Sequence, residues 1–158
     1  MLSYRHAFHA GNFADVLKHL VLAKTLDYMI EKPAPIRYID THAGSGCYRI
    51  NSAMSEKTGE YAAGAGALQA GLLKGAFAPY GALLKRHQAT GHYPGSPQIA
   101  ADMLRPQDQL YLHEMHPTDF SLLQKWAAQD RRIRVAQSDG HQAMRSLLPA
   151  IKGRAFVL

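Results

Sequence analysis

The fold is decided by residues 36–46, which read IRYIDTHAGSG. The first five residues, Ile36 to Asp40, form a short run of β-type composition that predicts a strand. A loop follows at once, and its Gly44-x-Gly46 turn lets the backbone approach a ligand closely, because glycine tolerates positive φ. We therefore expect this strand to deliver an acidic residue and a glycine bend to one end of a sheet.

Outward from this stretch, strands and helices alternate towards the C-terminus. The pattern predicts strands over residues 109–115, 133–137 and 154–158, and helices over residues 117–128 and 140–148. Such alternation is typical of a parallel sheet with right-handed crossovers. The predicted fold class is α/β.

Two further helices are expected, one before and one after residues 36–46. The first spans residues 13–30, begins at the N-cap Asn12 and ends at the Pro33-Ala34-Pro35 break. Its apolar residues recur at helical spacing: Phe13, Val16, Leu17, Leu20 and Val21. Later, Tyr93-Pro94-Gly95 is expected to form a turn, after which Ser96 caps a helix with Pro97 at its first position.

Acidic residues follow three successive predicted strands. Asp40 ends the first, Glu114 ends the second, and Asp139 follows the third. Ligands of open parallel sheets bind beyond the carboxyl ends of the strands, where Glu114 could accept from ribose hydroxyls and Asp139 from an adenine amine. Each acid alone could instead be a strand-end or capping residue. Together they predict a site for a nucleoside cofactor, and the lack of a third glycine after Gly46 argues against NAD.

The spacing of these acids predicts an insertion. Glu114 lies 74 positions after Asp40 (114 minus 40), whereas the usual separation from the glycine loop is about 20. The surplus coincides with a stretch rich in Ala, Gly and Leu, with helical patterning around residues 67–73 and 79–87. We expect a small helical subdomain over residues 52–92, inserted into a domain formed by residues 1–51 and 93–158.

Composition places the chain among ordinary globular proteins, with 47% apolar and 19% charged residues. No apolar run reaches the roughly 20 residues needed to cross a bilayer, the start does not resemble a signal peptide, and Cys47 is the single cysteine. These features favour the cytoplasm. A formal charge of +6 suits a polyanionic partner, although charge alone does not distinguish nucleic-acid binders from other basic proteins.

Four histidines are considered as candidate metal ligands: His6, His9, His19 and His42. Their spacing matches none of the known zinc patterns, and one cysteine adds no second thiolate. We therefore expect no metal, and histidines that cap, form hydrogen bonds or contact RNA phosphates.

Several motifs in this order and spacing resemble the RlmJ family of bacterial 23S ribosomal RNA adenine-N6 methyltransferases. The resemblance extends from Met1 to Leu158 and is carried by Tyr4-Arg5-His6-x-Phe8-His9-Ala10-Gly11-Asn12, Asp15-x-x-Lys18-His19, Asp40-Thr41-His42-Ala43-Gly44-x-Gly46, Thr58-Gly59-Glu60-Tyr61, Tyr93-Pro94-Gly95-Ser96-Pro97 and Glu114-x-His116-Pro117. It implies a Rossmann-like methyltransferase sheet with an inserted helical subdomain and an N-terminal tail.

The resemblance also implies a ligand set. S-adenosyl-L-methionine would be held by Lys18, His19, His42, Ser96, Glu114, Asp139 and Gly140, while Tyr4 on the N-terminal tail would contact the substrate adenine. Lys18 and His19 could reach the methionine carboxylate. The implied partner is 23S ribosomal RNA, protein-free or as an early precursor, with a monomer as the favoured state.

In the family, an Asp-Pro-Pro-aromatic motif follows the strand that corresponds to residues 154–158 and supplies the catalytic Asp. The sequence ends at Leu158, before that motif, so we expect no catalytic residue and little turnover from these 158 residues alone. Two other readings stay open, a DNA adenine-N6 methyltransferase and a non-catalytic RNA-binding module. S-adenosylhomocysteine should stabilise a methyltransferase and leave a pure RNA binder unaffected.

Overall fold

The computed structural model describes residues 6–50, 59–68, 73–149 and 152–158. Within these residues a sheet has the strand order β5-β4-β1-β6. The strands are β1 (Ile36–Asp40), β4 (Gln109–His113), β5 (Ile133–Ala136) and β6 (Arg154–Val157). All of their pairings are parallel. The predicted α/β fold with a parallel sheet is confirmed.

The strand order reverses at β1. The chain passes from β1 through β4 to β5 and then returns to place β6 on the other side of β1. In parallel sheets, ligands bind next to such a reversal, outside the carboxyl ends of the strands. The topology therefore points to the loops after β1, β4 and β5 as the place for a site.

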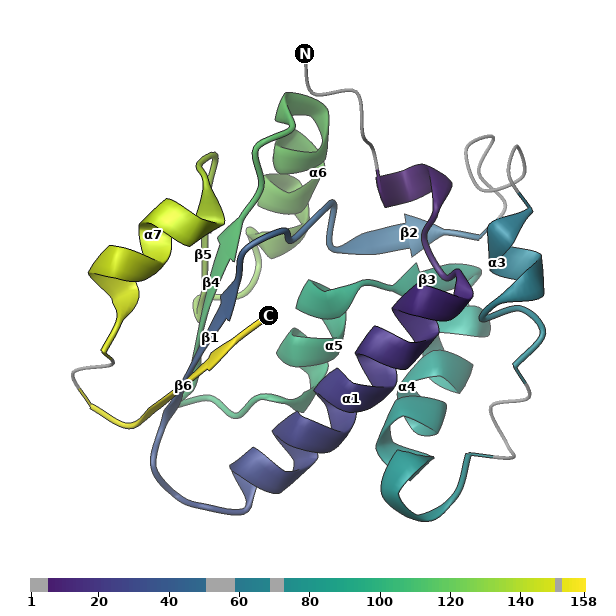
Figure 1. Cartoon of the computed structure of the whole chain (residues 1–158), viewed down its shortest axis with the longest axis horizontal. Coiled ribbons are helices and arrows are strands. Elements are labelled where there is room, and N and C mark those ends of the chain that lie inside the picture. The colour runs from purple at the N-terminus through teal and green to yellow at the C-terminus, as the bar shows by residue number, and fades with distance from the viewer. Residues whose placement is uncertain (1–5, 51–58, 69–72, 150–151) are drawn as a thin grey trace.

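Helices cover this sheet on both sides. Helix α5 (Ser96–Met103) packs against β1 and β4, and α1 (Phe13–Ile30) packs on α5. Figure 1 shows α7 (Gly140–Leu147) on the opposite side of the sheet from α5, and α6 (Pro117–Ala127) precedes β5. Both C-terminal helices begin where the sequence predicted. Within the described part of the chain, no helix is long and apolar enough to span a bilayer.

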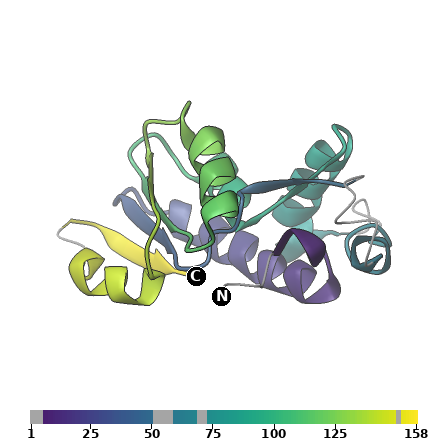
Figure 2. The same ribbon diagram turned by 90° about the horizontal axis from the view of Figure 1, so that it is seen from above.

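A second, antiparallel pair of strands leads away from the sheet. Strand β2 (Cys47–Arg49) pairs with β3 (His92–Pro94), so the turn expected at residues 93–95 is wrong in its first two positions. Figure 2, a view from above, shows this ribbon extending from the sheet towards the helices that separate β2 from β3 in the sequence. These are α3 (Glu60–Ala63), the 3-10 helix η3 (Gly75–Phe77) and α4 (Ala78–Gln88).

Helix α4 agrees with the helix expected around residues 79–87, whereas the one expected around residues 67–73 lies mostly outside the described residues. The assignment of residues 52–92 to a separate subdomain stays a prediction, since residues 51–58 and 69–72 also lie outside the described ranges.

Helix α1 has the predicted bounds but buries a different face from the one its apolar pattern indicates. The Asn12 side chain caps it by accepting from the Asp15 amide, as expected. However, Phe13 is 82% exposed, and Leu17 and Val21 are also exposed. The buried face is formed by Asp15, His19, Leu22, Ala23 and Leu26. Apolar residues lie on two faces of this helix, and the face that carries Asp15 and His19 is the one turned to the protein.

Candidate functional site

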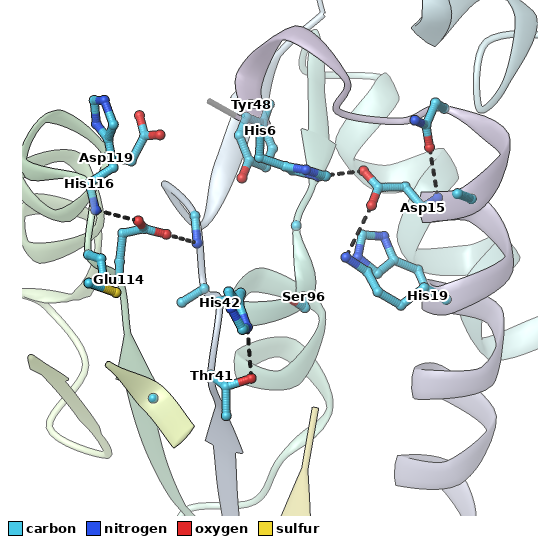
Figure 3. A pocket seen from close by; sticks show the side chains of 18 of the residues that line it. His6, Asp15, His19, Thr41, His42, Tyr48, Ser96, Glu114, His116 and Asp119 are labelled. Carbon is cyan, nitrogen blue, oxygen red and sulfur yellow. Dashed lines mark hydrogen bonds and ion pairs between the residues drawn. The ribbon is translucent and has the colours of Figure 1, made fainter. Parts of the chain in front are cut away.

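A hollow of about 600 Å³ lies at the carboxyl ends of the parallel strands. Its walls come from α1, the loop after β1, the start of α5, the loop after β4 and the start of α7. Figure 3 shows side chains from these separate elements turned towards one space. The volume falls within the roughly 300–1,000 Å³ typical of sites for small ligands and cofactors.

The residues predicted to hold a cofactor all line this hollow. They are Lys18, His19, His42, Ser96, Glu114, Asp139 and Gly140. Tyr4, predicted to contact the substrate, lies outside the described residues. The structure thus brings together residues that are up to 122 positions apart (140 minus 18).

Asp40 does not line the hollow, and its predicted place beside Glu114 and Asp139 is corrected. Its side chain is buried beneath the loop, at 1% exposure. It accepts hydrogen bonds from Tyr38 Oη at 2.9 Å, Ser96 Oγ at 2.7 Å and the His42 amide at 3.1 Å. Asp40 therefore stabilises the loop beneath the site and does not bind a ligand.

The prediction that Ser96 is the N-cap of its helix is also corrected. The N-cap of α5 is Gly95, which has extended backbone and makes no side-chain cap, and Ser96 is the first helical residue. Because its hydroxyl donates to Asp40, it joins the start of α5 to the end of β1. Ser96 keeps its predicted place in the wall of the hollow.

Glu114 connects two loops of the site, as the dashed lines in Figure 3 show. Its Oε2 accepts from the Gly44 amide at 2.9 Å, and its Oε1 accepts from the His116 amide at 2.7 Å. A carboxylate oxygen has a second lone pair, so each oxygen can still accept from a ligand hydroxyl. Glu114 can therefore bind a ligand and shape the glycine loop simultaneously.

Two glycines bring backbone close to the hollow. Gly44 has φ +60°, and an added Cβ would collide with the hydroxyl of Tyr48. At Gly140 an added Cβ would collide with the backbone of Thr41. Gly44 is thus required both for its positive φ and for the close contact, whereas Gly140 is required for the close contact alone.

Asp139 combines a structural role with a position in the wall. It is the N-cap of α7, and its Oδ1 accepts from the amides of His141 and Gln142 at 2.8 and 3.3 Å. Both capping bonds use the same oxygen. The second carboxylate oxygen, Oδ2, is thus the one suited to accept from a ligand amine.

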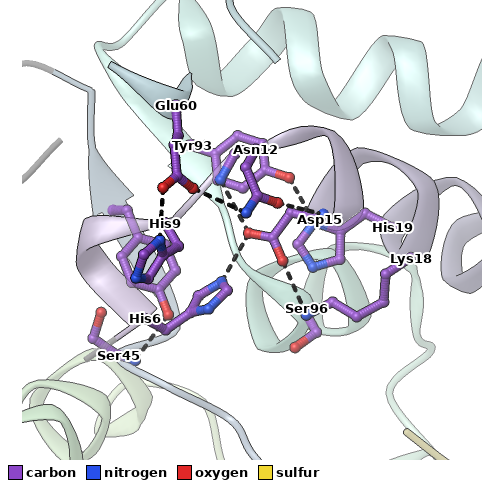
Figure 4. A network of polar contacts seen from close by, with 12 residues as sticks. His6, His9, Asn12, Asp15, Lys18, His19, Ser45, Glu60, Tyr93 and Ser96 are labelled. Carbon is purple, nitrogen blue, oxygen red and sulfur yellow. Dashed lines mark hydrogen bonds and ion pairs between the residues drawn. The ribbon is translucent and has the colours of Figure 1, made fainter. Parts of the chain in front are cut away.

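A buried carboxylate on α1 organises the opposite wall (Figure 4). Asp15 Oδ2 accepts from His6 Nε2 at 2.8 Å and from the Gly11 amide at 3.0 Å, and Lys18 Nζ lies 3.1 Å from Oδ1. Burial by itself would raise the pKa of Asp15, but the hydrogen bond from His6 and the charges of His19, His6 and Lys18 outweigh it. The net result is a pKa well below the usual range.

His19 is almost completely buried beside this carboxylate. Its Nδ1 lies 2.8 Å from the Tyr93 hydroxyl, and burial lowers its pKa to about 3. The imidazole is therefore neutral at pH 7. Its Nε2 has no hydrogen-bond partner among the described residues, although the side chain lines the hollow. A buried polar atom without a partner is the kind of group that a ligand satisfies.

Sequence reasoning missed several residues of the wall, namely His6, Asn12, Asp15, His116 and Asp119. Asp15 had a detectable signal, because it lies one turn before Lys18 on the same face of a helix. His6 and Asp119 had none, although the partner of His6, Asp15, lies only nine positions along the chain.

The histidines considered for a metal have separate partners. His6 contacts Asp15, His9 lies 2.9 Å from Glu60, and His42 contacts Thr41 and the ring of His141. Among the described residues, no group of three or more His, Cys, Asp or Glu side chains could hold a metal ion.

Comparison with known proteins gives a consistent result. A family model described as "Ribosomal RNA large subunit methyltransferase D, RlmJ" matches residues 32–158. Two proteins called "Ribosomal RNA large subunit methyltransferase J" are similar over the whole chain. The one from Escherichia coli is 44% identical over 162 residues, and the one from Haemophilus influenzae is 43% identical over 164 residues. The chain spans 58% of the length of each.

A solved structure is also similar. The crystal structure of protein LPL1258 from Legionella pneumophila superposes with a TM-score of 0.83 at 36% identity. The superposition covers 94% of this chain and 56% of that one. A larger protein of known structure thus shares most of this fold.

Proposed function

Because the chain belongs to the RlmJ family of ribosomal RNA large subunit methyltransferases, we propose that it binds S-adenosyl-L-methionine in the 600 Å³ hollow. The protein transfers the methyl group to the N6 amine of an adenine in 23S ribosomal RNA. The single observation that carries this proposal is the gathering of the predicted cofactor residues in one hollow at the carboxyl ends of parallel strands.

Three features of the hollow fit this cofactor. Glu114 offers two acceptor oxygens to the ribose hydroxyls, and Asp139 Oδ2 can accept from the adenine amine. His19 Nε2 is buried and unpartnered within the described structure, and with the ammonium of Lys18 it can bind the methionine carboxylate. Gly140 keeps the start of α7 close to the β1 loop, where a side chain would collide.

The bound cofactor supplies an electrophilic methyl group on a sulfonium. The residues of this chain bind and orient it, because Glu114 and Asp139 fix the nucleoside from one side and α1 fixes the amino-acid end from the other. Acidic side chains also line the hollow and suit a ligand with a cationic centre: Asp15, Glu114, Asp119 and Asp139.

An adenine amine is a weak nucleophile until acceptors localise its lone pair. In the family these acceptors belong to the Asp-Pro-Pro-aromatic motif that follows the strand corresponding to β6. We therefore propose that residues 1–158 alone bind the cofactor with little turnover, and that protein-free or early precursor 23S RNA is the substrate of the complete, cytoplasmic and monomeric enzyme.

Thermal unfolding with S-adenosylhomocysteine tests the cofactor. At 100 times its Kd the ligand should stabilise the protein by about 2.7 kcal/mol, whereas NAD should leave the unfolding temperature unchanged. No response to S-adenosylhomocysteine, or an equal response to NAD, would overturn the cofactor proposal.

Methyl transfer tests the substrate. The complete enzyme should place label from S-adenosylmethionine in N6-methyladenosine of 23S RNA transcripts, and much less in DNA of the same sequence. Equal labelling of the DNA would make DNA the substrate class, and RNA binding without any cofactor response would make the protein an RNA-binding module.

A further inference from the structure

A second hollow of about 510 Å³ lies beside the first and shares one residue with it. Tyr48 lines both, and most of the second hollow is formed by the β2–β3 ribbon, α6 and the end of α4, with single residues from η1 (His6–Phe8), the loop after β1 and α5. We call it the ribbon groove. Its principal lining residues are Cys47, Arg49, His87, His92, Leu122 and Trp126.

The pairing of β2 with β3 gives the groove its polar side. Arg49 is paired with His92, and Cys47 is paired with Pro94. Side chains of directly paired residues lie on the same face of an antiparallel ribbon, and alternate residues lie on opposite faces. Arg49 and His92 are therefore neighbours on the groove face, and the Arg49 side chain is exposed there.

Helix α6 gives the groove its apolar side. Leu122 is 45% exposed, and Trp126 follows it one turn later. The indole is held in place because its Nε1 donates to Gln98 Oε1 at 2.7 Å, and the ring packs so closely on Gly46 that an added Cβ would come within 3.0 Å. A fixed aromatic ring beside an exposed leucine offers an apolar surface for a planar group.

The first hollow is lined by four acids and Lys18, a charged set that is not repeated in the groove. Arg49, His87 and His92 line it, and none of its described lining residues is acidic. His87 is bonded to Asp102, which also pairs with Arg86 and accepts from Gln98, another lining residue of the groove. Arg49 is therefore the cationic group best placed to meet an anion inside the groove.

We propose that the ribbon groove binds a nucleotide of single-stranded RNA adjacent to the target adenosine. The base lies on Leu122 and Trp126, and its phosphate lies at Arg49. The arrangement is supported by the shared lining residue Tyr48, which makes the two hollows neighbours. Aromatic stacking combined with a cationic side chain is how proteins hold single strands. This inference rests on the proposed function, which makes RNA the substrate.

Charge reversal tests the phosphate contact. Arg49→Glu should weaken binding of a single-stranded RNA oligonucleotide by about tenfold, and Arg49→Gln should lower the slope of log affinity against log salt by about 0.7. Arg131→Glu is the matched control, because Arg131 is exposed before β5 at the far end of the sheet. It should change RNA affinity by less than about twofold.

The apolar contact needs a variant that folds. Leu122→Ala removes exposed surface without opening the core, and it should weaken RNA binding by about threefold. Trp126→Phe keeps a ring in place and should retain most of the affinity. Unfolding temperatures of all variants, measured without RNA, should match that of the unaltered protein within a few degrees.

The outcomes separate this inference from the proposed function. If Arg49→Glu leaves RNA affinity unchanged, or weakens it no more than Arg131→Glu does, the groove assignment is wrong even though S-adenosylhomocysteine still binds. If the unaltered protein does not bind S-adenosylhomocysteine, the proposed function fails whatever the groove variants show. A selective loss with Arg49→Glu and unchanged S-adenosylhomocysteine affinity supports the groove.

Discussion

The two hollows that share Tyr48 have similar volumes and different charged linings. The first, of about 600 Å³, is lined by the four acids Asp15, Glu114, Asp119 and Asp139 together with Lys18 and histidines, whereas the ribbon groove, of about 510 Å³, is lined by Arg49 and histidines without a described acid. Like charges at close range repel by several kcal/mol at intermediate dielectric. An RNA phosphate is therefore disfavoured in the first hollow and favoured in the second, while a sulfonium has the reverse preference. The difference in acidic lining thus favours the sulfonium in the first hollow and the RNA phosphate in the groove.

The two hollows also differ in how they are built. The first is formed by loops at strand ends, and the carboxylates of Asp40 and Glu114 hold these loops by accepting from their backbone amides. The groove is formed mainly by a short ribbon and helix α6, and the bond between Trp126 and Gln98 joins α6 to α5. Damage to a loop-holding carboxylate should thus affect the first hollow far more than the second.

The largest difference between the ligand affinities of the two hollows is expected for Glu114→Gln. The amide keeps the size of the side chain but has one acceptor oxygen in place of two, so the Gly44 and His116 amides cannot both be satisfied. Losing a charge-assisted hydrogen bond costs about 1.5–3 kcal/mol. Affinity for S-adenosylhomocysteine, measured by calorimetry, should fall by at least about tenfold.

Glu31→Gln is the matched control for this change, since Glu31 is exposed at the distant end of α1. It should leave the affinity unchanged, and RNA binding by the groove should be altered in neither variant. An equal loss of RNA and S-adenosylhomocysteine affinity in Glu114→Gln would show that the two hollows are not independent.

A smaller effect is expected for Gly140→Ala. The new methyl group would collide with the backbone of Thr41 and push α7 away from the β1 loop, and overpacking of this kind costs about 1–3 kcal/mol. Chemical denaturation should show the lost stability, and S-adenosylhomocysteine affinity should fall with it. Gly91→Ala is the comparison, because its Cβ would meet open space and strain the backbone alone. If both variants lose cofactor affinity equally, the collision is not the cause.

The first hollow could be predicted from the sequence because its parts lie at strand ends. Once β1, β4 and β5 are known to be parallel, the residues that follow them must meet at one edge of the sheet. Glu114 and Asp139 were placed correctly on this ground. The RlmJ resemblance, which the comparisons confirm, added the residues of α1.

What the sequence could not provide depends on contacts between distant segments. Asp40 has the same pattern as Glu114, but it points inward because Tyr38 and Ser96 donate to it. The ribbon pairs Cys47 with Pro94 across the whole insertion, so neither strand has a local signal long enough to detect. Helix α1 has apolar residues on two faces, and periodicity alone does not say which face is covered.

The smallest expected effect concerns pH and His19, the buried histidine of the first hollow. Burial lowers the pKa of His19 to about 3 from 6.5, so between these values the unfolded chain binds a proton that the folded protein does not. Acidification therefore stabilises the unfolded state. Because of His19, the free energy of unfolding falls by up to about 1.4 kcal/mol per pH unit below pH 6.5. Above pH 6.5 its contribution is complete.

Denaturation between pH 7 and pH 5 checks this expectation. Burial also lowers the pKa of His113, so His19→Gln should reduce the slope of stability against pH without abolishing it. Carboxylates such as Asp15, with an ordinary pKa of 3.8, titrate below this window and add little to it. A slope that His19→Gln does not alter would mean that His19 takes up its proton as readily in the folded protein as in the unfolded chain, and that the wall of the first hollow is wetter than its burial indicates.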